Sequence, residues 1–408
     1  MNKTKLLALI LSAAMVAGAL TGCGNDEKTP DAQSSQTSSS SEVSSEVSSE
    51  TSSEESVPNS APMEVADEIS VDYTDAFSVE YLDEGIKKVT DGENRELILI
   101  SKEIDEVPEE YKDSIVIRTP VERAIFLSAT QVCSLRPLNN DEIFKSVAGV
   151  SNGAEQWGDF AQIKNGIEDG SIKYVGGDMG DPDYELISSL NPDIVFVYTG
   201  DWPQAGVIEK LTELGINYAV DNDYMEKDYL ARMEWAKFIL TFFNEDEAAM
   251  KIMDTAIENI ENVKKTVEGL EQPKVLFASE FNGTVNVTDS NGWLGNMIKD
   301  AGGKSLFEGM PVESLSLSLE EFVVKANEAD IIVYTSTPTW MPGKSALLEK
   351  IPQLADCEAV KNGNLWQYTE NFWNGIDKSD VMAEDLAAIF YPEKYEGREL
   401  TFFTKMTD

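Results

Sequence analysis

The chain has 408 residues, with 32 Lys or Arg against 74 Asp or Glu, and its formal net charge is −42. This charge argues against a nucleic-acid partner, since no basic stripe is present to neutralise phosphates. The sequence contains no histidine, which excludes Ser-His-Asp and Cys-His catalysis and removes the usual zinc and manganese ligand sets. It also leaves only Tyr or Met as axial ligands for a haem.

Residues 1–22 have the layout of a secretory signal. Lys3 and Lys5 precede an apolar run over 6–20, which is too short to span a bilayer comfortably. The run ends in Leu20-Thr21-Gly22-Cys23, which resembles the bacterial lipobox, where cleavage precedes the cysteine and its thiol receives a diacylglycerol. We therefore expect lipidation at Cys23 and an extracytoplasmic protein anchored by lipid to the cell membrane.

Two segments separate this signal from the main body. Residues 23–65 contain the repeat SSEVSSEVSSETSSEES and almost no large apolar side chain. Such a segment cannot bury enough surface to offset the entropy of ordering, which predicts a disordered tether. Residues 66–119 contain short alternating stretches, the first of them over 69–73, and the turn signal Asp91-Gly92. These features predict short strands in a small β-rich segment.

From residue 120 onward, short apolar strands alternate with amphipathic helices. This alternation predicts an α/β fold with parallel-type sheets covered by helices on both faces. We expect a first lobe over 120–223, a helical connector over 224–272 and a second lobe over 273–408. Within the connector, residues 245–268 predict one helix of roughly 36 Å, long enough to join the two lobes.

Cys133 and Cys357 are the cysteines that remain after Cys23. They fall in different predicted lobes, so we expect two buried thiols that behave as small apolar side chains.

The two lobes share one sequence motif. It reads Glu185-Leu186-Ile187 followed by Asn191-Pro192-Asp193-Ile194-Val195 in the first lobe, and Glu320-Glu321-Phe322 followed by Ala329-Asp330-Ile331-Ile332-Val333 in the second. This motif resembles one in the substrate-binding proteins of ABC importers for ferric siderophores, haem and cobalamin, a periplasmic-binding-protein-like family. Similarities at 123–128, 302–303 and 359–363 support this, and the resemblance covers about 120–395.

The resemblance implies two α/β lobes joined by a rigid helix, with the ligand in the cleft between them. It implies a monomer that delivers a small chelate to a permease and its ATPase. The absence of a Walker loop and of a histidine base predicts a protein that is not an enzyme and has no cofactor. The lack of histidine also predicts that no bare metal ion is bound. A ferric siderophore is the first candidate, and a corrinoid or haem are alternatives within the class. A surface adhesive or structural lipoprotein is the alternative from another class.

In the family, one exposed glutamate on each lobe pairs with arginines of the permease. The matching positions are Glu185 and Glu320. Glu321 stays open as a substitute for Glu320, because the second lobe departs from the usual Asn-Pro-Asp before its strand.

Ligand contacts are expected where strands end, because open α/β folds bind ligands beyond the carboxyl ends of their strands. Aromatic side chains in loops suit a large, partly apolar chelate, and the few basic residues there favour a neutral or cationic hydroxamate over an anionic catecholate. Trp293 is a further tryptophan in an apparent loop. The predicted contact residues are Ser128, Thr130, Trp157, Trp202, Asn282, Trp340 and Trp373.

Overall fold

The computed structural model describes residues 68–177, 180–200, 204–311 and 315–408. The predicted signal, the lipidation site Cys23, the tether and Trp202 therefore lie outside the described residues. No helix in the described ranges is long and apolar enough to cross a membrane.

The described chain begins with a four-stranded sheet of order β1-β2-β3-β4, in which β4 runs parallel to β3 and the other pairs are antiparallel. Residues 69–73, expected as a strand, are not one, because the Glu234 carboxylate accepts the backbone N–H groups of Asp72, Tyr73 and Thr74. The strands are β1 (Ser78–Asp83), β2 (Ile86–Thr90), β3 (Glu96–Ser101) and β4 (Ile115–Thr119).

One face of this sheet shares a core with the first lobe. Val89, Leu97 and Leu99 are fully buried and belong to the same cluster as Trp235 and Phe238 of α5 (Tyr229–Thr241). The β-rich segment is thus packed into the first lobe rather than hinged on it.

The first lobe, here the N-lobe, has a fully parallel five-stranded sheet of order β7-β6-β5-β8-β9. Its strands are β5 (Ala124–Phe126), β6 (Val147–Val150), β7 (Lys173–Tyr174), β8 (Ile194–Val197) and β9 (Tyr218–Val220). Its helices are α1 (Ala129–Cys133), α2 (Ala161–Asp169), α3 (Tyr184–Leu190) and α4 (Gln204–Leu214). Strands β5, β6 and β8 are buried along their whole length, as expected of a sheet covered on both faces.

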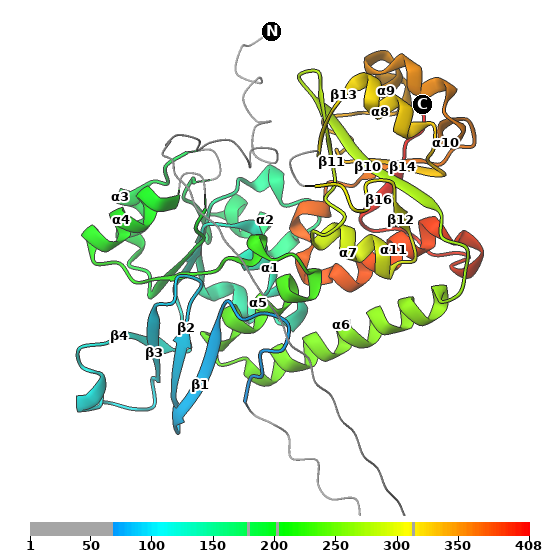
Figure 1. The fold of residues 1–408 in the computed structure, drawn as a ribbon. Helices are drawn as coiled ribbons and strands as arrows, with labels where there is room; N and C mark the ends of the chain where they lie inside the picture. The colour runs from blue at the N-terminus through cyan, green and yellow to red at the C-terminus, as the bar shows by residue number, and fades with distance from the viewer. Residues whose placement is uncertain (1–67, 178–179, 201–203, 312–314) are drawn as a thin grey trace, which may run out of the picture. The chain divides into compact units, whose positions relative to one another are not determined.

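Helix α6 (Asp246–Val267) joins the N-lobe to the second lobe, here the C-lobe (Figure 1). Ala249 packs into the N-lobe core, whereas Met253 and the later apolar residues pack into the C-lobe core. Acidic residues occupy its first turn and Lys264 and Lys265 its last, which suits the helix dipole.

The C-lobe has a mixed sheet of order β13-β11-β10-β14-β15-β16, with β12 also paired to β10. Strands β10, β12, β14 and β15 are parallel, and β11, β13 and β16 are antiparallel to their neighbours. The strands are β10 (Lys274–Phe281), β11 (Thr284–Val287), β12 (Lys304–Ser305), β13 (Ser316–Ser318), β14 (Ile331–Tyr334), β15 (Leu365–Tyr368) and β16 (Phe403–Lys405). The helices are α7 (Trp293–Asp300), α8 (Leu319–Ala326), α9 (Lys344–Lys350), α10 (Glu358–Lys361) and α11 (Ser379–Phe390).

The predicted fold class is therefore confirmed: two α/β lobes with parallel-type sheets and one long connecting helix. The antiparallel strands β11 and β13 were not predicted.

Candidate ligand-binding cleft

A cleft of about 270 Å³ lies where the two lobes meet. Its walls come from α1 and the start of the connector on one side and from α7, α11 and the segment between β15 and α11 on the other. The lining residues are Thr130, Tyr224, Arg232, Trp293, Phe372, Trp373, Ile376 and Met382.

Asp223, just after β9, organises the N-lobe side of the cleft. Its Oδ1 accepts a hydrogen bond from the Thr130 hydroxyl at 3.0 Å, and its Oδ2 accepts one from Arg232 Nη2 at 2.9 Å. The Ser128 and Thr130 hydroxyl oxygens lie 2.9 Å apart. One carboxylate thus fixes Thr130 and Arg232, two of the side chains that line the cleft.

Arg232 is the basic residue of the cleft lining. Its side chain is 10% exposed, and its buried Nε donates no hydrogen bond to any described residue. The guanidinium lies over the Trp293 ring, 4.8 Å from the ring centroid, a geometry that favours a cation–π contact. With Asp223 paired to it, Arg232 adds hydrogen-bond donors to the cleft but little net positive charge.

The C-lobe wall of the cleft is aromatic. Trp373 is 51% exposed and packs edge-on against Phe372 and Tyr368, with ring centroids 5.2 and 5.6 Å away. Phe372 in turn packs at 6.2 Å from Trp293. These contacts hold two indole rings in place, which suits the binding of a flat or partly apolar ligand.

Asp221 lies beside Asp223 on the N-lobe side of the cleft and is buried. Its carboxylate accepts the backbone N–H of Asp223 at 3.0 Å. Burial, together with the neighbouring charge of Asp223, raises the pKa of Asp221 well above its ordinary value. Burial thus disfavours the charged form of Asp221.

Direct contacts fasten the lobes together beside the cleft. Arg136 of the N-lobe donates from Nε and Nη2 to the two carboxylate oxygens of Asp377 at 2.9 and 2.6 Å, and it also donates to the Asn374 carbonyl. The Asn374 side chain donates to the Gln156 carbonyl at 2.6 Å. The segment that carries Trp373 and the rest of the aromatic wall is thus attached to the N-lobe.

A second groove, of about 510 Å³, lies beside the turn between β2 and β3. All of its lining residues belong to that turn or to the N-lobe. The smaller cleft is the candidate ligand site, because both lobes build it and because its aromatic rings are fixed. The residues that line the groove are Glu93, Arg95, Thr199, Gly200, Ile208, Tyr218 and Val220.

Comparison with known proteins identifies the family. A family model described as "Periplasmic binding protein" matches residues 144–371, more than half of the chain. A lipoprotein of Methanocaldococcus jannaschii, named as uncharacterised, is 30% identical over 330 residues, covering 78% of each chain. The chain belongs to the periplasmic binding protein family. A second uncharacterised lipoprotein of the same organism is 26% identical, over 82% of this chain and 86% of its own length.

Solved structures share this fold. The CeuE protein of Helicobacter pylori in a nickel–histidine complex has a TM-score of 0.55 at 17% identity, over 77% of this chain and 91% of its own. A periplasmic haem binding protein of Pseudomonas aeruginosa has a TM-score of 0.55 at 16% identity, over 71% and 99%. A periplasmic vitamin B12 binding protein of Vibrio cholerae has a TM-score of 0.50 at 14% identity, over 68% and 99%. Members of this family are substrate-binding proteins rather than enzymes.

The structure brings some predicted contact residues together and separates others. Thr130 and Trp373 line the cleft, and Ser128 lies behind Thr130. Trp157 is 1% exposed, and its indole N–H donates to the Asn152 carbonyl at 3.1 Å, so it packs inside the N-lobe. Asn282 lies in the exposed turn between β10 and β11, and Trp340 is exposed but is not part of the lining.

The predicted docking glutamates occupy equivalent places on the two lobes. Glu185 lies in the first turn of α3 and Glu320 in the first turn of α8, and both are exposed. Glu321 instead closes a capping box: its Oε2 accepts the backbone N–H and the hydroxyl of Ser318 at 2.9 and 2.7 Å. Glu320 is therefore the better candidate of the two, because its carboxylate makes no hydrogen bond or ion pair with any described residue.

The sequence analysis missed five of the lining residues: Tyr224, Arg232, Phe372, Ile376 and Met382. Arg232 and Met382 lie inside helices α5 and α11, where helical periodicity alone indicates a packing role. Phe372 and Ile376 lie in the segment between β15 and α11. Tyr224, by contrast, follows β9 closely, so the strand-end rule applied to every predicted strand would have found it.

The cysteine expectation is confirmed. Cys133 and Cys357 are both buried and unpaired, and burial raises the pKa of each thiol. Neither has the microenvironment of a reactive thiolate.

Proposed function

We propose that this protein is the extracytoplasmic substrate-binding component of an ABC importer, anchored by lipid at Cys23, and that its ligand is an iron chelate, first of all a ferric siderophore. One observation carries the proposal: the cleft between the lobes is walled by fixed aromatic rings and has a single paired arginine. Family membership supports the binding role.

The donor set of the cleft favours a chelate whose metal already has its full set of ligands. The sequence contains no histidine, and the Tyr224 hydroxyl donates to the Thr199 carbonyl. A haem would need an axial ligand from this set, which leaves Met382, whereas a hydroxamate siderophore surrounds its iron with its own oxygens. A corrinoid, whose cobalt is likewise enclosed by its own ring, is the second candidate.

Charge and size favour a ligand that is not strongly anionic. Arg232 shares its charge with Asp223, and the chain as a whole is highly acidic, so a highly charged catecholate would meet little compensation. Arg232 can still donate a hydrogen bond to a hydroxamate oxygen. The cleft volume of about 270 Å³ is at the low end for ligand sites, so we expect a chelate to be partly enclosed and to remain partly exposed at the mouth.

Titration of the purified protein tests the proposal. Quenching of tryptophan fluorescence should report binding of a ferric trihydroxamate, and weaker or no quenching is expected with a ferric tricatecholate and haemin; cyanocobalamin tests the corrinoid alternative. Binding of none of the four would refute the iron-chelate proposal, and binding of haemin alone would replace the siderophore by haem.

Two tryptophan variants locate the site. Trp373→Ala removes a ring from the cleft wall and should weaken binding by about five- to 150-fold, from a loss of roughly 1–3 kcal/mol. Trp340→Ala is the matched comparison, because Trp340 is 44% exposed against 51% for Trp373 and does not line the cleft. Weaker binding in Trp340→Ala would mean that the ligand site includes Trp340, as the sequence predicted. Unchanged binding in Trp373→Ala would mean that this cleft is not the ligand site.

A further inference from the structure

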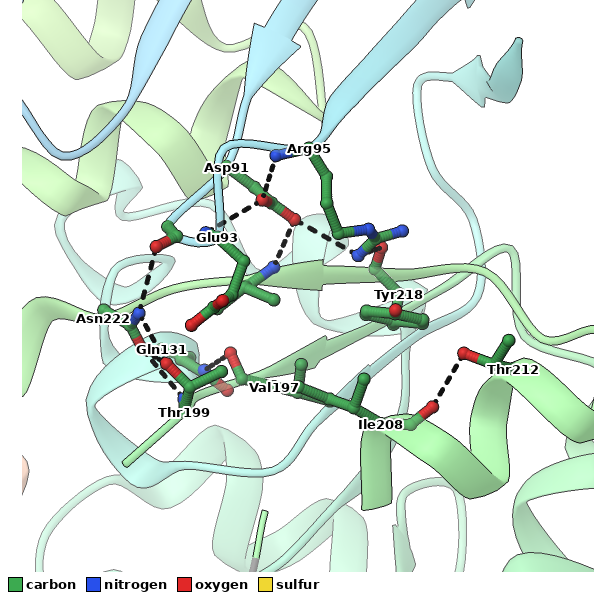
Figure 2. A network of polar contacts seen from close by, with 12 residues as sticks. Asp91, Glu93, Arg95, Gln131, Val197, Thr199, Ile208, Thr212, Tyr218 and Asn222 are labelled. Carbon is green, nitrogen blue, oxygen red and sulfur yellow. Dashed lines mark hydrogen bonds and ion pairs between the residues drawn. The ribbon is translucent and has the colours of Figure 1, made fainter. Parts of the chain in front are cut away.

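The turn between β2 and β3 is fastened to the edge of the N-lobe sheet (Figure 2). Asp91 is fully buried, and its carboxylate accepts the backbone N–H groups of Glu93, Arg95 and Val220 at 3.1, 2.9 and 3.1 Å. The Gly92 N–H donates to the Val220 carbonyl at 2.9 Å. The turn therefore pairs with the last residue of β9, which is the edge strand.

Asn222 extends this contact toward the neighbouring strand β8 (Figure 2). Its Oδ1 accepts the Thr199 N–H at 2.8 Å, and its Nδ2 donates to the Gly92 carbonyl at 3.3 Å. A Cβ on Gly92 would lie 2.9 Å from Asn222 Nδ2, so the close approach requires glycine. One side chain thus joins the N-terminal sheet, the end of β9 and the chain that follows β8.

The next two residues connect this contact to the ligand cleft, since Tyr224 lines the cleft and Asp223 holds two other lining residues. Asp223 holds Thr130 and Arg232 by the hydrogen bonds described above. Tyr224 donates its hydroxyl to the Thr199 carbonyl, the same residue whose N–H Asn222 accepts. Each cleft residue on the N-lobe side is therefore positioned by the segment that the N-terminal turn supports.

We propose that the β2–β3 turn of the N-terminal sheet is a positioning element for the ligand cleft, and that Asn222 is the positioning residue that connects them. The inference rests on the proposed function only in taking this cleft as the ligand site. It gives the N-terminal sheet a role in ligand affinity. Because Asn222 is buried and satisfies several polar groups at once, its removal leaves those groups unpaired, and we expect binding to weaken about tenfold.

Two readouts on the full chain test the proposal, one of which needs no ligand. Asn222→Ala should speed hydrogen–deuterium exchange at residues 198–200 and 221–226 and should weaken binding of a ferric trihydroxamate about tenfold. Gly92→Ala, which forces the turn away from Asn222, should do the same in weaker form. It also serves as the second variant in case Asn222→Ala fails to fold.

Ile98→Ala is the control, because Ile98 is buried on the other face of the same sheet, away from the turn and the N-lobe. It should lower the melting temperature at least as much as Asn222→Ala, yet leave exchange at 221–226 and trihydroxamate affinity unchanged. Unchanged exchange in both turn variants, or equally fast exchange in Ile98→Ala, would overturn the positioning role. If the unmodified protein binds no chelate, the proposed ligand fails while the exchange measurement still decides the inference.

Discussion

The ion pair between Arg136 and Asp377 should control whether the two lobes unfold as one unit. It crosses from the N-lobe to the segment before α11, and its side chains are 16% and 1% exposed. Removing one partner of a buried pair leaves the other charge uncompensated, which typically costs about 3–5 kcal/mol. Arg136 keeps the Asn374 carbonyl and the Phe160 ring at 4.6 Å, so we expect Asp377→Asn to fall near the lower limit.

Calorimetry and urea unfolding measure this effect. The unmodified protein should show one cooperative transition, and Asp377→Asn should separate it into two, since it removes the buried ion pair between the lobes and leaves α6 and the neutral contacts of Asn374 to connect them. The double variant Arg136→Met with Asp377→Leu removes both charges and should recover most of the stability, because a buried pair adds little over apolar side chains of similar volume.

An exposed ion pair provides the control. Lys361 and Glu358 form one on α10, with side chains that are 48% and 72% exposed, so Glu358→Gln should change stability by no more than about 1 kcal/mol. The reasoning fails if Asp377→Asn is as mild as Glu358→Gln, or if the double variant is as unstable as both single changes added together.

Four further predictions concern titration, docking, anchoring and metal binding. Asp221→Asn should raise the melting temperature at neutral pH and make the melting temperature less dependent on pH. The pKa of Asp221 is raised in the folded state. The unmodified protein therefore loses stability as the pH rises from the ordinary Asp pKa of about 3.9 through the raised value. Glu185→Lys with Glu320→Lys should leave chelate binding intact and abolish uptake in cells, because exposed charges set docking register and on-rate. Cys23→Ser should move the protein from the membrane fraction to the soluble fraction. Calorimetry should detect no micromolar binding of free zinc or manganese, since carboxylates alone give weaker selectivity.

A specific result would contradict each of these predictions. A falling melting temperature in Asp221→Asn at neutral pH would mean that the carboxylate is stabilising. Glu247→Lys with Glu258→Lys makes the same charge change at exposed positions on α6. If this variant loses uptake to the same extent, the loss comes from the change in net charge and not from docking at Glu185 and Glu320. Membrane retention of Cys23→Ser would exclude lipidation as the anchor, and tight zinc binding would contradict the metal prediction.

The sequence predicted the elements whose signals are local. The connecting helix, expected over 245–268, runs from Asp246 to Val267, since its apolar spacing and terminal charges are all contained in one segment. The short strand β11 (Thr284–Val287) was missed because four residues with alternating burial carry little signal. Residues 69–73 were taken for a strand because the sequence cannot show that Glu234, some 160 positions later, captures their N–H groups.

The candidate site was harder to predict because its residues are brought together by tertiary structure. Trp157 and Trp373 both looked like loop tryptophans, yet the first is 1% and the second 51% exposed. What separates them is packing: Trp157 is enclosed by Phe160 and its neighbours, whereas Trp373 is supported from one side. Arg232 reaches the cleft only because α5 crosses behind Asp223, and nothing in the local sequence of a helix reveals that position.

The core shared by the N-terminal sheet and α5 has a consequence for how the chain acquires its structure. The backbone N–H of Asp72 meets its partner Glu234 only 162 residues later, and Lys87 of the first sheet pairs with Asp246. The strands made first must therefore wait, with their apolar face uncovered, until more than half of the polypeptide has been synthesised. Contacts this distant in sequence form slowly. Such delayed closure suits the secretory route that the predicted signal over residues 1–22 implies, in which a chain crosses the membrane unfolded and folds afterwards.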